Sequence, residues 1–227
     1  MPGKRPKAVV LLSGGLDSAT TLFLAESKGF DCRCLIFDYG QRHKKEISSA
    51  RAVSRKAGSR FKVMKIALPW KGSSLLDRGA AIPMNRSFAR IKKGIPSTYV
   101  PARNTIFLAY AMSYAEAIGA GRLFIGAHFQ DSSGYPDCRS AYIKAFGRVA
   151  KLGTKSGLAE GLKICAPLVN KKKKDVIRLG HSLGVPFKLT RSCYCAGRSP
   201  CGKCDSCILR KKGFKEAGLN DPVSAAD

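Results

Sequence analysis

The feature of this sequence that most constrains its fold is a glycine turn, Ser13-Gly14-Gly15-Leu16-Asp17-Ser18. It follows a short apolar run at residues 7–12 that predicts a buried strand, and it leads into a helical spacing of apolar residues at 18–28. Glycines let a backbone approach a phosphate closely, and the free N–H groups of a helix's first turn point at such an anion. The sequence therefore predicts a phosphate-binding loop. The residues expected around the phosphates are Leu12, Ser13, Gly14, Gly15, Leu16, Asp17, Ser18, Ala19 and Thr20.

Three side chains of the turn can add to this binding. Ser13 and Ser18 offer hydroxyl donors, and Asp17 is placed either to help hold Mg²⁺ or to cap the helix. The simpler interpretation is a tight turn from strand to helix with a serine or aspartate cap and no ligand. The turn is not a Walker A loop, because no Gly-Lys-Ser/Thr follows the glycines. It is not a nucleophile elbow either, since that motif requires Gly-x-Ser-x-Gly.

The rest of the chain alternates strand and helix patterns, which predicts an α/β fold with a parallel sheet and helices on both faces. We expect further strands at 34–37, 61–68, 123–126 and 164–169, and helices at 43–57, 104–120, 142–152 and 170–184. Residues 69–102 contain several prolines and glycines and predict a long loop with at most short helices. We expect an α/β domain at 1–188 and a small cysteine-rich segment with a short basic tail at 189–227.

The cysteines near the carboxyl end predict a metal site. Cys201, Cys204 and Cys207 are separated by two residues each, and both Cys193 and Cys195 lie upstream as candidates for a fourth ligand. Four thiolates on tight turns match tetrahedral Zn²⁺, and such a metal can fold a segment too short to form its own core. An iron–sulfur cluster is the alternative.

The net charge of +26 is extreme for an enzyme, with 41 Lys and Arg against 15 Asp and Glu. Such a charge attracts nucleic acid or another polyanion, but it also suits a merely basic, solvated surface. The positive residues are spread along the chain and accompany no recognisable nucleic-acid module, so nucleic-acid binding is possible but not favoured as the main function. The run Lys171–Lys174 is interpreted in the same way, as a solvated face rather than a polyanion contact.

No apolar stretch is long enough for a membrane helix. The basic residues at 4–7 and the apolar run after them are too short, and lead into the wrong kind of turn, for a signal peptide. We therefore expect a cytoplasmic protein, in which a tight cysteine cluster indicates a metal site rather than disulfides.

The glycine turn resembles the pyrophosphate loop of the N-type ATP-pyrophosphatase superfamily, whose members cleave ATP to AMP and pyrophosphate. Further blocks narrow the match, because they resemble the 7-cyano-7-deazaguanine synthase family and follow one another in that family's order over nearly the whole chain. These blocks are residues 37–43 (FDYGQRH), 100–104 (VPARN), 131–139 (DSSGYPDCR) and the terminal cysteine cluster.

The resemblance implies a Rossmann-like, adenine nucleotide alpha hydrolase-like sheet and a ligase that consumes ATP with Mg²⁺. Its implied substrates are 7-carboxy-7-deazaguanine and ammonia, and its implied product is 7-cyano-7-deazaguanine, formed through an acyl-adenylate in queuosine biosynthesis. It also implies a homodimer and a structural zinc with Cys193, rather than Cys195, as the fourth ligand beside Cys201, Cys204 and Cys207.

The resemblance also supplies catalytic candidates, which are Asp17, Ser18, Arg103, Asp131 and Asp137. A carboxylate after a strand can accept hydrogen bonds from a guanine-like edge, and we assign this to Asp137. Asp131 could instead assist metal binding, while Arg103 or Arg139 would steer the substrate carboxylate or the phosphates. The competing interpretation of the two acids is a capped turn with solvated side chains.

Residues Tyr39, Gln41, Arg42 and His43 are active-site candidates without an assigned role, and His128 is expected to line the cleft. Two other functions remain open. One is a related enzyme that modifies a deazaguanine already in tRNA or in another macromolecule, and the other is a zinc-bearing nucleic-acid binder without catalysis.

Overall fold

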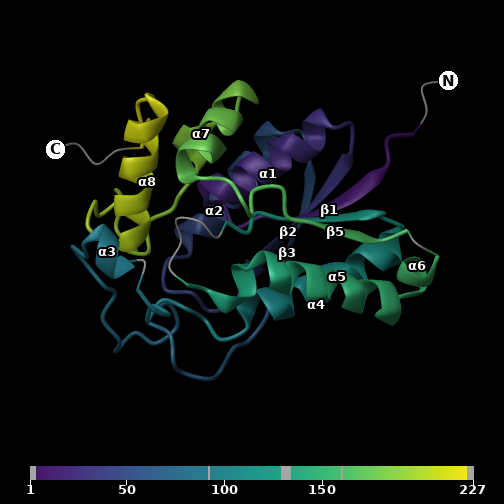
Figure 1. The fold of residues 1–227 in the computed structure, drawn as a ribbon, viewed down its shortest axis with the longest axis horizontal. Helices are drawn as coiled ribbons and strands as arrows, with labels where there is room; N and C mark the ends of the chain where they lie inside the picture. The colour runs from purple at the N-terminus through teal and green to yellow at the C-terminus, as the bar shows by residue number, and fades with distance from the viewer. Residues whose placement is uncertain (1–3, 92, 129–133, 160, 224–227) are drawn as a thin grey trace.

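A five-stranded parallel sheet forms the centre of the molecule in our computed structural model, which describes residues 4–91, 93–128, 134–159 and 161–223 (Figure 1). The strands lie in the order β3-β2-β1-β4-β5, and every neighbouring pair is parallel. Their bounds are β1 Lys7–Leu11, β2 Asp31–Asp38, β3 Arg60–Lys65, β4 Arg122–Ile125 and β5 Lys163–Cys165. The predicted parallel α/β sheet is confirmed.

The strand order reverses between β1 and β4. From β1 the chain adds β2 and β3 on one side, and it then returns to add β4 and β5 on the other. In open parallel sheets the crevice outside the carboxyl ends of such a pair of strands is where ligands bind. The glycine turn at 13–18 leaves β1 at this point.

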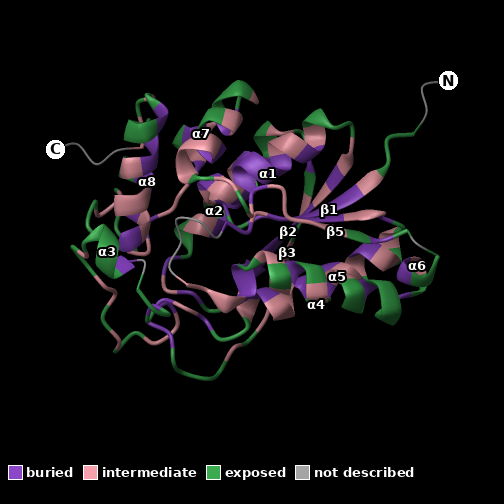
Figure 2. Cartoon of the chain, viewed as in Figure 1, coloured by how far each residue is buried: buried purple, intermediate pink, exposed green. Residues whose placement is uncertain are grey.

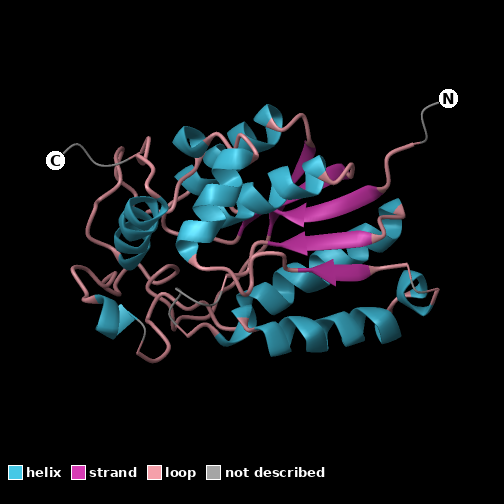
Figure 3. Cartoon of the chain, turned by 45° about the horizontal axis from the view of Figure 1, so that its top comes forward, coloured by secondary structure: helices cyan, strands magenta, loops and turns pink. Residues whose placement is uncertain are grey.

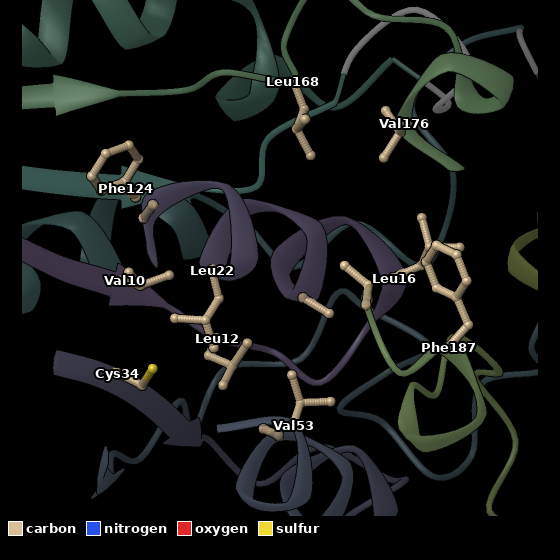
Figure 4. Close-up of a cluster of buried hydrophobic side chains, with 14 of the residues drawn as sticks. Val10, Leu12, Leu16, Leu22, Cys34, Val53, Phe124, Leu168, Val176 and Phe187 are labelled. Atoms are coloured by element: carbon tan, nitrogen blue, oxygen red, sulfur yellow. The ribbon is translucent and has the colours of Figure 1, made fainter. Parts of the chain in front are cut away.

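Two hydrophobic clusters cover the two faces of the sheet, because alternate strand side chains point to opposite sides. On β1, Val10 belongs to the cluster with the amino-terminal helices, whereas Val9 belongs to the cluster on the other face. Figure 4 shows the first cluster, in which Leu22 of α1 packs over Val10. Figure 2 shows the same pattern as buried residues on the inner sides of both helix layers.

The helices form one layer on each face (Figures 1 and 3). One layer contains α1 Leu16–Ser27, α2 Lys45–Lys56, α7 Lys173–Ser182 and α8 Asp205–Ala217. The other contains α4 Arg103–Ile118, α5 Ser140–Gly153 and the short α6 Lys155–Leu158. Within the long segment predicted as a loop, α3 is a single turn at Phe88–Ile91, as expected. Two short 3₁₀ turns occur at Pro136–Cys138 and Phe187–Leu189.

Several parts of the secondary-structure prediction were wrong. The expected basic tail is helix α8, because Phe214 and Ala217 are buried in the first cluster, and Gly218 ends the helix with a φ of 73°. The last strand was predicted at 164–169 but spans only Lys163–Cys165, and α7 begins three residues later than expected, at Lys173 after Lys172.

Helix α8 lies directly against α7. A Cβ added to Gly213 would stand 2.4 Å from Cγ of Lys173 and 2.8 Å from Cδ1 of Ile177, so only glycine permits this approach. Arg210, almost fully buried, donates to both oxygens of Asp221 at 2.7 and 2.9 Å. The carboxyl-terminal segment thus joins the layer that contains α1, while the predicted division at residue 188 stays a prediction.

Among the described residues, none of the helices combines the length and apolar character needed to span a bilayer.

Candidate functional site

A cavity of about 280 Å³ opens at the carboxyl edge of the sheet, where the strand order reverses. Its walls come from the β1–α1 turn, the ends of β2 and β4, the first turn of α4, Lys173 of α7 and the cysteine-rich segment. From the glycine turn and its flanks, Leu12, Ser13, Gly15, Leu16, Asp17 and Ser18 line it. The cavity therefore lies at the turn that the sequence predicts to bind phosphates.

The turn is held in one shape by its glycines and by Ser18. Gly14 has a φ of 83°, and a Cβ on it would stand only 2.3 Å from the carbonyl oxygen of Glu46, so the turn packs directly against the backbone of α2. Ser18 Oγ accepts from the N–H of Ser13 at 3.2 Å and donates to the carbonyl of Gly15 at 3.0 Å. Gly15 is the N-cap of α1 and has no side chain to occupy the amides that follow it.

Asp17 faces a lysine from the far end of the sequence. Nζ of Lys173 lies 2.8 Å from each carboxylate oxygen of Asp17, and both side chains line the cavity. Burial by itself raises the pKa of Asp17, but the charge and hydrogen bonds of Lys173, together with the charges of His128 and Arg210, more than offset this, so the pKa lies below its ordinary value. Asp17 is thus an anion beside the turn, and the helix cap considered for it is filled by Gly15 instead.

Arg103 forms the opposite wall together with aromatic rings. Its Nη1 donates to the hydroxyl of Tyr39 at 2.9 Å, and its guanidinium carbon lies 5.6 Å from the centre of the Tyr39 ring and 5.8 Å from that of Phe107. Burial raises the pKa of Tyr39 to about 12, so its hydroxyl stays neutral. The left-handed residue Ala102, with a φ of 49°, precedes Arg103 at the start of α4. A fixed guanidinium in a cavity wall is suited to bind a carboxylate or phosphate.

A histidine network lies at the start of α2. His43 Nε2 lies 2.8 Å from one oxygen of Glu46, and the other oxygen accepts from Gln41 Nε2 at 2.8 Å. Gln41 is 1% exposed and also bonds the backbone of Phe37 and Tyr39, at 3.0 and 2.8 Å. His43 and Glu46 line the cavity, whereas Gln41 supports them from behind.

The cysteine cluster has the geometry of a metal site. One sulfur from each of Cys193, Cys201, Cys204 and Cys207 lies within 4.8 Å of every other, and Cys195 does not belong to this group. The sulfurs of Cys201 and Cys207 are 4.0 Å apart, close to the edge of about 3.8 Å in a tetrahedron with metal–sulfur bonds of about 2.3 Å. The backbone N–H of Cys195 donates to the sulfur of Cys193 at 3.3 Å. These four residues could hold a metal ion.

The cysteine-rich segment also closes the cavity, which the sequence did not indicate. The N–H of Arg191 donates to the carbonyl of Gly14 at 2.8 Å, so the segment is bonded to the glycine turn itself. Five further residues of this segment line the cavity, and no local motif marked them: Ser192, Tyr194, Ser206, Leu209 and Arg210.

The interpretation of Lys171–Lys174 as a solvated face was wrong for Lys173. Its side chain is 15% exposed and is bonded to Asp17, because the start of α7 crosses the head of α1. The only signal in the sequence for an inward-facing Lys173 was its spacing from Val176 and Ile177, which lie three and four positions further along α7 and are buried. Residues three and four apart lie on the same face of a helix.

The remaining predicted residues divide into two groups. His43, His128 and Arg103 line the cavity, whereas Ala19 and Thr20 are fully buried in the core and, like Gly14, are not part of its lining. Arg42 donates to the backbone carbonyls of Ser74 and Ala80 and so braces the long loop.

Asp137 lies beside the cavity rather than in its lining. Its Oδ2 accepts from the N–H of Asn104 at 3.0 Å, at the amino end of α4, and burial raises its pKa. Its contact with a guanine edge stays a prediction. Asp131 lies outside the described residues, so its predicted role also stays a prediction.

Comparison with known proteins shows the family of this chain. The family model described as "Queuosine biosynthesis protein QueC" matches residues 7–218, from β1 to the end of α8. This chain belongs to that family. Curated relatives include the 7-cyano-7-deazaguanine synthase of Nostoc punctiforme, 51% identical over 96% of this chain and 98% of the relative. The enzyme of the same name from Anaeromyxobacter dehalogenans is 50% identical over 97% of this chain and 96% of its own length.

These two relatives align with this chain over nearly its whole length. Among solved structures, the NMN synthetase of Francisella tularensis aligns over 97% of this chain and 80% of its own, with 18% identity and a TM-score of 0.49. That likeness is too low to bear on chemistry.

Proposed function

We propose that this protein is an ATP-dependent ligase that converts 7-carboxy-7-deazaguanine and ammonia into 7-cyano-7-deazaguanine. The observation that carries the proposal is the glycine turn at the head of α1, which opens onto a cavity also lined by Lys173 and Arg103. Relatives about 50% identical over nearly their full length carry the synthase name. The reaction consumes ATP in two activations, the first giving an amide and the second dehydrating it to the nitrile.

The turn binds the triphosphate in this proposal. A carboxylate oxygen is a poor leaving group in water, so the substrate attacks the α-phosphorus of ATP to form an acyl-adenylate and release pyrophosphate. The amides of Leu16 and Asp17 at the head of α1, together with the Ser13 and Ser18 hydroxyls, would hold the pyrophosphate as its charge develops. Mg²⁺, held by Asp17 with or without Asp131, would supply further charge neutralisation. Lys173 is placed to share that role, because it already pairs with Asp17.

The wall opposite the turn binds the deazaguanine. Arg103, fixed by Tyr39 and Phe107, would steer the substrate carboxylate toward the α-phosphorus. Flat apolar rings near the carboxyl end of β2 suit a planar heterocycle, and Phe37 is already stacked on Phe107 with ring centres 4.1 Å apart. Asp137 would accept from the ring N–H and exocyclic amine of the guanine edge.

The four cysteines hold a structural Zn²⁺. Their sulfurs fit a tetrahedron, and four protein ligands leave no open position for catalysis. The metal would fix the segment that carries Arg191 and Tyr194 into the cavity wall. An iron–sulfur cluster is the rival occupant, and metal analysis together with the visible absorption spectrum separates the two.

The second candidate function is modification of a deazaguanine already in tRNA, and the +26 charge is the observation that favours it. We propose the free base as the substrate, because the cavity of about 280 Å³ has the size of a small-molecule site and no nucleic-acid module accompanies the charge. A cytoplasmic homodimer that takes free ammonia completes the proposal.

The test is incubation of purified protein with ATP, Mg²⁺, ammonium and the free base, followed by chromatography of the products. We expect nitrile, AMP and pyrophosphate without added RNA. Turnover only with tRNA would support the second candidate, and salt-sensitive RNA binding without ATP cleavage would refute both. Asp17→Ala should abolish ATP–pyrophosphate exchange while the metal content stays unchanged, and near-normal exchange in this variant would place the active site elsewhere.

A further inference from the structure

One ring nitrogen of His43, Nε2, is hydrogen-bonded to Glu46, and the other, Nδ1, has no hydrogen-bond partner among the described residues. One carboxylate oxygen of Glu46 accepts a hydrogen bond from Nε2–H of His43, and the other accepts from Nε2 of Gln41. Gln41 is itself tied to the backbone through both ends of its amide. A histidine that donates from Nε2 to a carboxylate has its lone pair on Nδ1, and the carboxylate fixes both the tautomer and the ring plane.

Nδ1 is the atom of this network that has nothing to bond. It is buried, and the described part of the protein offers it no hydrogen-bond partner. The whole residue is 4% exposed, yet it lines the cavity, where the ring of Tyr194 faces it at 6.3 Å between centres. A buried polar atom without a partner is costly, and such an atom in a cavity wall marks a place where a ligand supplies the missing bond.

The network is also fixed relative to the phosphate turn. Gly14 touches the backbone of α2 at the residue that holds the histidine, since an added Cβ would stand 2.3 Å from the carbonyl oxygen of Glu46. The basic nitrogen therefore belongs to the same rigid unit as the turn that receives the pyrophosphate. In the proposed function the carboxyl group is adenylated beside that turn, so we infer that this nitrogen lies on the side of the cavity where the acyl group reacts.

We propose that Nδ1 of His43 is the general base that removes the proton from ammonia as it attacks the acyl-adenylate, with Glu46 and Gln41 as positioning residues. The inference rests on the proposed function. In the step, the nitrogen lone pair forms the new C–N bond and one N–H proton passes to Nδ1. The bond between the acyl carbon and the phosphate oxygen breaks, and AMP leaves with that electron pair. The products are the amide, AMP and one proton, which returns to solvent from the imidazolium.

The experiment separates the two half-reactions. Pyrophosphate exchange into ATP, dependent on the carboxylate substrate and measured without ammonium, reports adenylation. Amide and nitrile formation with ammonium reports the step assigned to His43. His43→Gln keeps a side-chain N–H for Glu46 but has no basic nitrogen. We expect amide formation to fall about 100-fold or more while exchange stays within about threefold of the wild type.

Two further variants make the result specific. Glu46→Gln should lower amide formation and spare exchange in the same manner, because an amide has one acceptor oxygen where the carboxylate has two and cannot accept from both His43 Nε2 and Gln41 Nε2. His181→Gln, on the exposed side of α7 and outside the cavity lining, is the matched control and should leave both half-reactions unchanged. Circular dichroism and melting temperature confirm folding of each variant.

The outcomes are distinct. Loss of exchange in folded His43→Gln would show that His43 contacts the phosphates and would overturn the assignment. Unchanged amide formation in this variant would overturn it as well. If the wild-type protein itself shows no exchange with the carboxylate substrate, the proposed function fails and this inference fails with it.

Discussion

Replacement of Gly14 by alanine tests whether the glycine turn packs against the backbone of α2 as in the structure. Two costs add at this position. A φ of 83° is a left-handed conformation, which costs a residue with a Cβ about 1–2 kcal/mol. The new methyl would stand 2.3 Å from the carbonyl oxygen of Glu46 and 2.7 Å from the nitrogen of Ala50. Both are backbone atoms of a helix, so they cannot rotate away, and such overpacking costs about 1–3 kcal/mol more.

The sum is a loss of about 2–5 kcal/mol in the free energy of unfolding. For a chain of this size it corresponds to a decrease of about 4–20 °C in melting temperature. The control is Gly58→Ala, at a φ of 68° with no atom within 4 Å of the added Cβ, which carries the conformational cost alone. Urea denaturation monitored by circular dichroism gives the free energy of unfolding of each variant. We expect Gly14→Ala to be the more destabilising by about 1–3 kcal/mol. Equal losses in the two variants would refute the close contact between the turn and α2.

Three other perturbations test the ion pair, the metal site and the docking of α8. Because the pKa of Asp17 is lowered in the folded protein, its charge stabilises the fold above the ordinary value of 3.8, and this contribution is lost as pH falls through the folded pKa. Asp17→Asn should therefore be less stable than the wild type at neutral pH and should converge with it in acid, as acid titrations of unfolding will show. Cys204→Ser should lose bound metal and melt at a lower temperature, while Cys195→Ser, outside the cluster, should retain a full equivalent in metal analysis. Arg210→Met removes the ion-pair partner of Asp221, whose side chain is only 10% exposed. It should lower the free energy of unfolding in denaturant by about 3–5 kcal/mol. A loss below about 1 kcal/mol would mean that this ion pair does not hold α8 in place.

Local sequence patterns were enough to predict the strands, the glycine turn and three of the clustered cysteines, because each depends on residues close together in the sequence. The apolar runs predicted the strands, since a parallel strand buried on both faces must be apolar on both. The glycine turn was identifiable because its conformation is set within six residues, from Ser13 to Ser18. The cysteine spacing brought three thiols together without any long-range contact, and only the choice of Cys193 needed the resemblance to a known family.

The tertiary structure alone decided which distant residues complete the cavity. Lys173 meets Asp17 across 156 positions of sequence, and only its helical spacing from Val176 and Ile177 distinguishes it from the other three lysines of the run. Helix α8 carries many basic residues and looked like a tail, but its contact with α7 at Gly213 makes it part of the core layer. These contacts depend on how α7 crosses α1 and how α8 packs on α7, and such crossings are set by packing over the whole layer rather than by any local period. The sequence therefore predicts which turn binds phosphate, and the packing of the carboxyl-terminal helices decides what surrounds that turn.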